Sequence, residues 1–178
     1  LRLSAQNGGL CISRGIGTCR ERIIESHELI FVAEGCLNFQ EDGRTFELNA
    51  GETLLLFPHR SHGGTKEYPP DLKYYWIHFT LTGDGSKDLE RQSLGPENGG
   101  ISSFTVPQHT FVKNQERLLS LFRWFLDAQE TKELQQTEAD MLVYLMLFEV
   151  SKSLRKKTSD NQHEVVANRT RQYLQTHF

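Results

Sequence analysis

The chain has 178 residues, a formal net charge of −3 and 24% charged residues. This length can bury one substantial hydrophobic core, and the slightly acidic balance excludes an overall basic footprint for nucleic acid. No run of about 18 apolar residues is present, so no membrane span is expected. The three cysteines, Cys11, Cys19 and Cys36, form no CxxC pair, which predicts reduced thiols and a cytoplasmic protein.

Short β-prone runs fill the first half of the chain. Apolar or alternating stretches predict strands over 29–32, 37–40, 45–48, 53–57 and 74–81, and turn signals at Gly35, Asp42-Gly43 and Gly51 separate them. Short strands at this spacing are typical of an all-β sandwich or barrel, and a small barrel can hold one small molecule. The polar, glycine-rich segment 83–100 is expected to form a long surface loop.

The hydrophobic period becomes helical after about residue 112. A first helix is predicted over 113–129, where Leu118, Phe122 and Phe125 form a stripe that we expect to pack on the barrel.

A second helix is predicted over 135–155, and its middle, 141–148, is apolar on every face. Such a helix is either the buried centre of a monomer or part of a subunit interface, and having only two substantial helices favours the interface. The predicted interface residues are Met141, Leu142, Leu145 and Phe148.

The ordered set of residues between positions 22 and 79 resembles the cupin-like effector domain of AraC-type transcription regulators. The residues that carry the resemblance are Arg22, His27-Glu28-Leu29, Val32, Gly35, Asp42-Gly43-Arg44, Leu48, Gly51-Glu52, Leu54-Leu55-Leu56-Phe57-Pro58, His62 and Tyr75-Trp76-Ile77-His78-Phe79. The resemblance implies a mainly β fold with α, in which a cupin-like β-barrel (jelly roll) is followed by two helices and a C-terminal helix.

The sequence pattern divides the chain into three parts, and the resemblance implies their roles. Residues 1–106 are expected to form the effector-binding barrel, and residues 107–157 a helical dimerisation segment. Residues 158–178 are expected to contain a linker and the first helix of a truncated helix-turn-helix DNA-binding domain. An ordinary C-terminal helix docked on the barrel is the alternative for this last segment.

The predicted ligand-binding residues are Glu34, His62, Tyr74, Trp76 and His78. Alternation places Tyr74, Trp76 and His78 on one face of the last strand, and the resemblance to sugar-binding members puts Tyr74 and Trp76 at ligand-contacting positions. A purely structural, core role for Tyr74 and Trp76 is the alternative. Glu34 stands where some members carry an arginine, so a neutral polyol or a cationic ligand fits better than a carboxylate.

A metal-dependent cupin enzyme is the first rival interpretation. Such enzymes hold their metal with an HxH pair, a Glu and a later His, but this chain has only His27 at the first position, with His59, His62 and His78 further on. No GxSxG, P-loop or GxGxxG motif is present either. We therefore expect no catalytic activity, no metal and no cofactor.

The function that the resemblance implies is that of the effector-sensing and dimerising part of an AraC-type regulator. Its expected partners are a small-molecule effector such as a sugar or polyol, a second copy of the chain, and DNA through a helix-turn-helix domain absent here. A stand-alone binding module without a DNA role is the second rival, and helix-turn-helix units encoded after Phe178 would separate the two.

Overall fold

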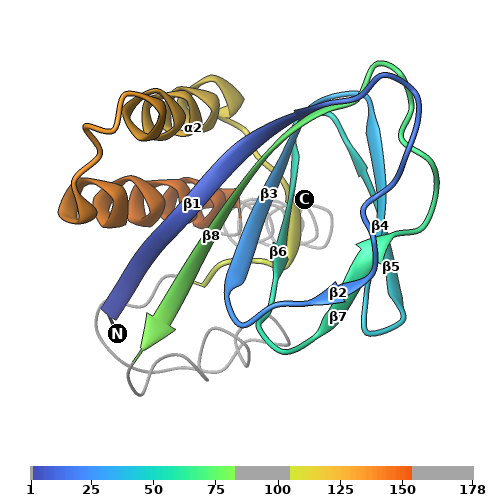
Figure 1. Cartoon of the computed structure of the whole chain (residues 1–178), viewed down its shortest axis with the longest axis horizontal. Helices are drawn as coiled ribbons and strands as arrows, with labels where there is room; N and C mark the ends of the chain where they lie inside the picture. The colour runs from blue at the N-terminus through green and yellow to red at the C-terminus, as the bar shows by residue number, and fades with distance from the viewer. Residues whose placement is uncertain (1, 83–104, 154–178) are drawn as a thin grey trace, which may run out of the picture.

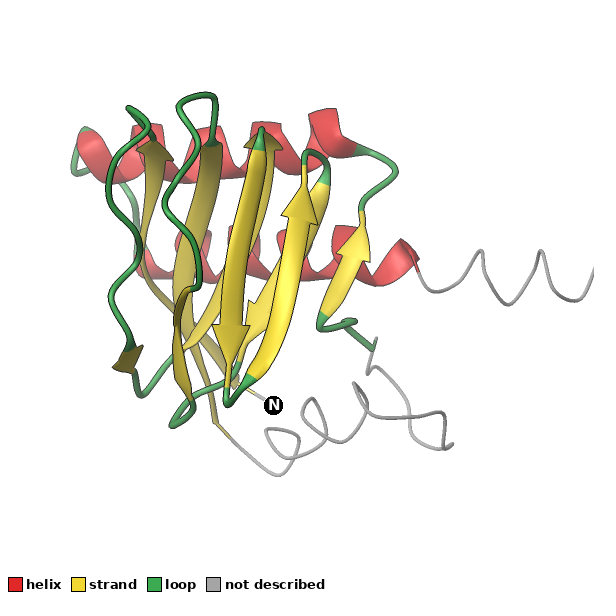
Figure 2. Ribbon diagram, turned by 90° about the vertical axis from the view of Figure 1, so that its right-hand side faces the viewer, coloured by secondary structure: helices red, strands yellow, loops and turns green. Residues whose placement is uncertain are grey.

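Two antiparallel sheets face each other and enclose the interior of a barrel, and a layer of helices covers the outer face of the larger sheet (Figures 1 and 2). This arrangement comes from a computed structural model, which describes residues 2–82 and 105–153. The strands are β1 (Arg2–Ile12), β2 (Arg22–Ile23), β3 (His27–Glu34), β4 (Cys36–Glu41), β5 (Arg44–Asn49), β6 (Glu52–Leu56), β7 (Ser61–Gly64), β8 (Lys73–Thr82) and β9 (His109–Phe111). The predicted cupin-like barrel with helices is confirmed.

The strand order is β1-β8-β3-β6-β9 in the larger sheet and β2-β7-β4-β5 in the smaller one. The β4–β5 hairpin turns at Asp42-Gly43, as predicted, with φ of 47° and 81° at the two positions. Positive φ at both central residues defines a type I′ turn, whose twist matches that of the flanking strands. Across this hairpin Leu37 pairs with Leu48, and Phe39 with Phe46, so one face of the smaller sheet fills the barrel.

The larger sheet separates two hydrophobic cores, and the alternation along β8 shows why. Tyr75, Ile77 and Phe79 point to the helices, where they join one cluster. Tyr74 points into the barrel and belongs to the other cluster, with Trp76 packed beside it. The prediction that β8 presents two different faces is therefore confirmed.

Helix α2 (Gln115–Glu130) begins at Asn114, whose side chain accepts a hydrogen bond from the Arg117 backbone N–H at 3.1 Å. Its predicted stripe is buried on the sheet, and the Phe122 ring lies 5.5 Å from Tyr75 and 6.2 Å from Phe31 between ring centroids. The helix predicted over 113–129 is thus confirmed within two residues.

Residues 136–153 form the second helix of the described chain, and its apolar residues are divided between two faces. One face joins the core shared with the sheet, through Leu142, Val143, Met146, Leu147 and Val150. The other face carries Met141, Tyr144 and Leu145, which are 58%, 46% and 39% exposed. Leu142 is a correction to the predicted interface set, because it is 3% exposed and packs inside this chain.

Several elements were not predicted from the sequence. Strands β1, β2, β7 and β9 have no clear period-two apolar pattern, and the pairing of β9 with β6 carries the sheet beyond the boundary expected at residue 106. The glycine-rich segment 83–100 and the linker and helix expected within 158–178 lie outside the described residues. Within residues 2–82 and 105–153 no helix is long and apolar enough to cross a membrane.

Candidate ligand-binding site

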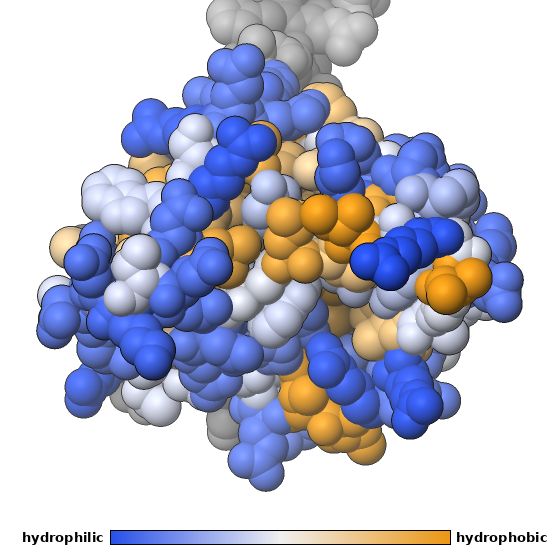
Figure 3. Space-filling model, turned by 45° about the horizontal axis from the view of Figure 1, so that its top comes forward, coloured by the Kyte–Doolittle hydropathy of each residue, from blue (hydrophilic) through white to orange (hydrophobic). Residues whose placement is uncertain are grey.

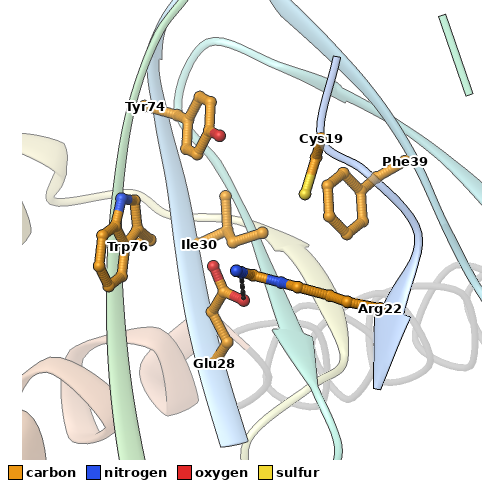
Figure 4. A pocket seen from close by; sticks show the side chains of 7 residues that line it. All are labelled: Cys19, Arg22, Glu28, Ile30, Phe39, Tyr74 and Trp76. Carbon is orange, nitrogen blue, oxygen red and sulfur yellow. Dashed lines mark hydrogen bonds and ion pairs between the residues drawn. The ribbon is translucent and has the colours of Figure 1, made fainter. Parts of the chain in front are cut away.

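The barrel contains a cavity of about 180 Å³ between the two sheets (Figure 4). Its walls come from β2, β3, β4, β8 and the segment before β2, and they consist of Cys19, Arg22, Glu28, Ile30, Phe39, Tyr74 and Trp76. Pockets that bind drug-sized ligands have volumes of about 300–1,000 Å³, so this cavity is smaller. The cavity therefore suits a ligand of few heavy atoms.

A buried carboxylate and a guanidinium form the polar part of the wall. Arg22 Nη2 lies 3.2 Å from Glu28 Oε2, and the Glu28 side chain is only 4% exposed whereas that of Arg22 is 46% exposed. Burial raises the pKa of Glu28 to about 6, against the opposing effect of the Arg22 charge. Near neutral pH the pair is ionised and its net charge is zero.

Two imidazoles lie behind this ion pair. His62 Nδ1 is 3.2 Å from the Arg60 carbonyl oxygen, to which it can donate, and His62 Nε2 then accepts from Arg22 Nε at 3.4 Å. His78 Nδ1 lies 2.9 Å from Ser26 Oγ, and its Nε2 lies 3.7 Å from Glu28 Oε2.

Burial lowers the pKa of both rings, that of His78 to about 4, and the Arg22 charge acts in the same direction. Both imidazoles are therefore neutral near neutral pH, and their approach to Glu28 is dipolar rather than ionic.

The other wall of the cavity is aromatic. The Trp76 indole is half-buried and meets the His78 ring edge-on at 5.1 Å between centroids. Tyr74 and Tyr68 join their hydroxyls at 3.1 Å. Burial raises the pKa of Tyr68 to about 12 and also raises that of Tyr74, so both phenols keep their protons as hydrogen-bond donors.

The structure brings four of the five predicted ligand residues to this part of the barrel. Tyr74 and Trp76 line the cavity, and His62 and His78 adjoin its ionic wall without lining it. Glu34 is not among the lining residues: its exposed carboxylate pairs with Lys73 Nζ at 2.8 Å. The register of β3 against β8 shifts between Val32 and Glu34, opposite Lys73, which leaves Glu34 at the end of the paired region.

Sequence reasoning missed the lining roles of Arg22, Glu28, Cys19, Ile30 and Phe39. A signal for Glu28 was available, because a charged residue directly before the apolar run 29–32 is rare in a buried strand unless it is paired.

The three cysteines are free thiols, and burial raises the pKa of Cys19, which keeps this thiol protonated at the cavity wall.

These residues do not form a metal centre. Within residues 2–82 and 105–153, no group of three or more His, Cys, Asp or Glu side chains is arranged to hold a metal ion. Glu28, His62 and His78 come near one another, but the Arg22 guanidinium lies between Glu28 and His62 and provides the positive charge there. In the described part of the chain, the polar wall of the cavity thus consists of hydrogen-bond donors and acceptors.

A barrel with a polar and aromatic cavity and an outer helical layer defines a small-molecule-binding domain. The model of the AraC-like ligand binding domain matches residues 13–147, and the chain belongs to this family.

Among curated relatives, the chain is 25% identical over 167 residues to the uncharacterised HTH-type transcriptional regulator YisR of Bacillus subtilis. The match covers 89% of this chain and 57% of that protein, so the chain spans little more than half the length of this relative.

Solved structures match parts of the chain, and two of them are cupins or enzymes by their names. A predicted oxalate decarboxylase from Thermotoga maritima is 15% identical, with a TM-score of 0.39, over 43% of this chain and 68% of its own. An RmlC-like cupin from Shewanella frigidimarina is 20% identical, with a TM-score of 0.32, over 39% of this chain and 60% of its own.

Proposed function

We propose that the chain is the effector-sensing and dimerising part of a cytoplasmic transcription regulator. In this proposal it binds a small uncharged polar molecule, such as a sugar or polyol, in its barrel. Binding controls a helix-turn-helix part of the same protein that contacts DNA. The domain has no catalytic activity in this proposal. Membership of the AraC-like ligand binding domain family and the similarity to an HTH-type regulator support the role.

The observation that carries the effector class is the Arg22–Glu28 pair in the cavity wall. A ligand there meets a guanidinium that donates and a carboxylate that accepts, with a net charge of zero. Hydroxyl groups both donate and accept, so they can satisfy both partners. A carboxylate ligand would face the buried Glu28 charge, and an ammonium ligand would face Arg22.

The aromatic wall completes this preference. Trp76 offers a ring face, and Tyr74 offers a protonated hydroxyl on the same strand. The C–H faces of a small polyol can pack on the indole while its hydroxyls reach the polar wall. The acceptor role first expected of Glu34 is assigned to Glu28 in this proposal, because Glu28 lines the cavity.

The test is a thermal-shift panel of pentoses, hexoses and polyols, with carboxylates and amines of similar size as charge controls. We expect an uncharged compound to stabilise the protein, and calorimetry then measures its binding to two aromatic variants. Trp76→Ala should weaken binding by about 1–3 kcal/mol, or about 5- to 150-fold in Kd, because an aromatic wall is lost. Phe111→Ala is the control, since Phe111 lies on β9, is 52% exposed and does not line the cavity.

Stabilisation by carboxylates or amines alone would overturn the uncharged class. Equal effects of Trp76→Ala and Phe111→Ala on binding would overturn the site. Stoichiometric metal by elemental analysis, lost in His62→Ala, would favour the rival interpretation as a metal-dependent cupin enzyme.

Dimerisation is the second part of the proposal. The exposed apolar side chains of the helical layer are Trp124, Met141, Tyr144 and Leu145, with Phe148 half-buried beside them. Figure 3 shows apolar groups that interrupt the polar surface of the molecule. Two adjacent helices with outward apolar residues favour a two-fold contact with a second copy, in which one patch is complementary to itself.

A further inference from the structure

Two adjacent glycines in β1 face opposite sides of the larger sheet. The pairing of β1 with β8 runs from Ala5↔Phe79 to Gly8↔Ile77, so Gln6 and Asn7 together oppose a single residue of β8. This β-bulge shifts the alternation by one residue. As a result Gly8 faces the helices, and Gly9 faces the barrel next to Trp76.

Gly9 is in direct contact with the cavity wall. A Cβ atom at this position would lie 2.6 Å from Cζ2 of the Trp76 indole, closer than any side chain allows. The indole therefore packs directly against the β1 backbone at Gly9, so a shift of that backbone towards the barrel must move the Trp76 ring.

Gly8 is held from the other side by α2. Its N–H donates to Gln129 Oε1 at 3.0 Å, and its carbonyl accepts from Gln129 Nε2 at 3.0 Å. These are the two hydrogen bonds that another strand would supply at this free sheet edge. A Cβ atom on Gly8 would lie 3.4 Å from both Phe125 and Leu126 and 2.9 Å from the Trp76 carbonyl oxygen, so close packing also favours glycine here.

The second helix repeats this contact at the other end of the bulge. The Ala5 N–H donates to Asp140 Oδ1 at 2.8 Å, and the Ala5 carbonyl accepts from Gln136 Nε2 at 2.9 Å. Asp140 directly precedes Met141 in the chain, and Met141 lies on the exposed face of this helix. Both helices of the outer layer therefore hold the backbone of the strand on which the cavity wall rests.

We propose that Gln129 is a positioning residue for the ligand cavity. By fixing the Gly8 backbone it holds Gly9 against Trp76, and the β1 bulge couples the cavity wall to the helical layer. A ligand that moves the Trp76 indole also shifts the Gly8 backbone and distorts its two hydrogen bonds to Gln129. In the reverse direction, a displacement of the helices moves the indole. The biological meaning rests on the proposed function, but the coupling itself can be measured without any ligand.

The experiment uses the full chain with Trp124→Phe, which leaves Trp76 as its single tryptophan. In this background Gln129→Ala should move the Trp76 emission to longer wavelength, increase its quenching by acrylamide and speed hydrogen exchange at the Gly8 amide. The matched control is Glu130→Ala, an exposed neighbour on α2, which should change none of the three.

Gln129→Glu keeps the acceptor for the Gly8 N–H and loses the donor to its carbonyl, so it should lie between the parent and Gln129→Ala. If Gln129→Ala fails to fold by far-ultraviolet circular dichroism, this variant decides the question. In the reverse direction, Gly9→Ala displaces the indole and should speed exchange at Gly8.

Faster exchange at Gly8 with unchanged Trp76 emission and quenching would overturn the coupling. Failure to find a ligand would weaken the proposed function and leave these ligand-free results unaffected, so the two proposals fail separately.

Discussion

Replacing Glu28 by Gln should remove the loss of stability that the folded barrel suffers when this buried carboxyl group ionises. Glu28 is 3% exposed, and its pKa rises from 4.5 to about 6 on folding. The folded protein therefore holds this proton more tightly than the unfolded chain does. The stability that Glu28 contributes is complete below pH 4.5 and is lost as the pH rises through about 6.

The size of the effect follows from the same two values. One pKa unit corresponds to about 1.4 kcal/mol, so the loss between pH 4.5 and pH 6 is about 2 kcal/mol. Glutamine has the same shape and does not titrate. Relative to the parent, Glu28→Gln should therefore gain about 2 kcal/mol in free energy of unfolding between acidic and neutral pH, with a plateau above pH 6.

His78 has the opposite pH dependence, which is why the difference between two proteins must be measured. Its pKa falls from 6.5 to about 4 on folding, so its contribution is present above pH 6.5 and is lost as the pH falls through about 4. Both proteins carry His78, and its contribution cancels in the difference. Equilibrium urea unfolding from pH 4 to pH 8, at one protein concentration, supplies the free energies.

A difference between Glu28→Gln and the parent that stays constant from pH 4 to pH 8 would refute this reasoning. It would mean that the Arg22 charge offsets the burial of Glu28 completely. A difference that grows towards acidic pH would reverse the sign and place the pKa of Glu28 below 4.5.

Three further outcomes follow from the geometry. Met141→Glu, at a 58% exposed position, should give a folded monomer by light scattering, whereas Leu142→Glu, at a buried position, should unfold the chain. A parent protein that is already monomeric at high concentration would contradict the interface. Gly51→Ala should lower the free energy of unfolding by about 1–3 kcal/mol, because φ is 88° there and the new methyl meets the first side chain of α2; an unchanged urea midpoint would contradict this. Glu34→Gln should change stability by less than about 1 kcal/mol, since its pairing with Lys73 is exposed, and a loss of ligand affinity in calorimetry would restore its expected role in binding.

The strands that could be predicted from the sequence are those in which the residues of the strand itself show a β pattern. The alternation over Tyr74, Trp76 and His78 is local information, and it placed these side chains on the barrel face correctly. Strand β1 lacks such information, because Gln6 and Asn7 form a bulge and Gly8-Gly9 have no side chains to show a pattern. Its place in the sheet is fixed by pairing with β8 and by hydrogen bonds from distant side chains such as Gln129.

The contact between Arg22 and Glu28 in the cavity wall could not be predicted from the sequence, for a related reason. Arg22 and Glu28 are close in sequence, but they meet only because β2 pairs with β7 on the smaller sheet while β3 lies in the larger one. That contact depends on how the two sheets close. Glu34 is a second case. The turn signal at Gly35 predicts that a strand ends beside Glu34, as β3 does, but whether this end residue faces the cavity or solvent depends on the register shift against β8.

Under the proposed function, the Arg22–Glu28 pair predicts that the barrel selects its ligand by hydrogen bonding. A molecule that separates the two leaves a carboxylate that is only 4% exposed without its cation, which is unfavourable because the buried charge loses its partner. Arg22 is half-exposed and can recover hydrogen bonds from water, but Glu28 cannot. A ligand that displaces Arg22 must therefore supply its own hydrogen-bond donors to Glu28. An apolar molecule of equal volume leaves Glu28 without a donor, so its binding free energy is less favourable even where it packs well on Trp76.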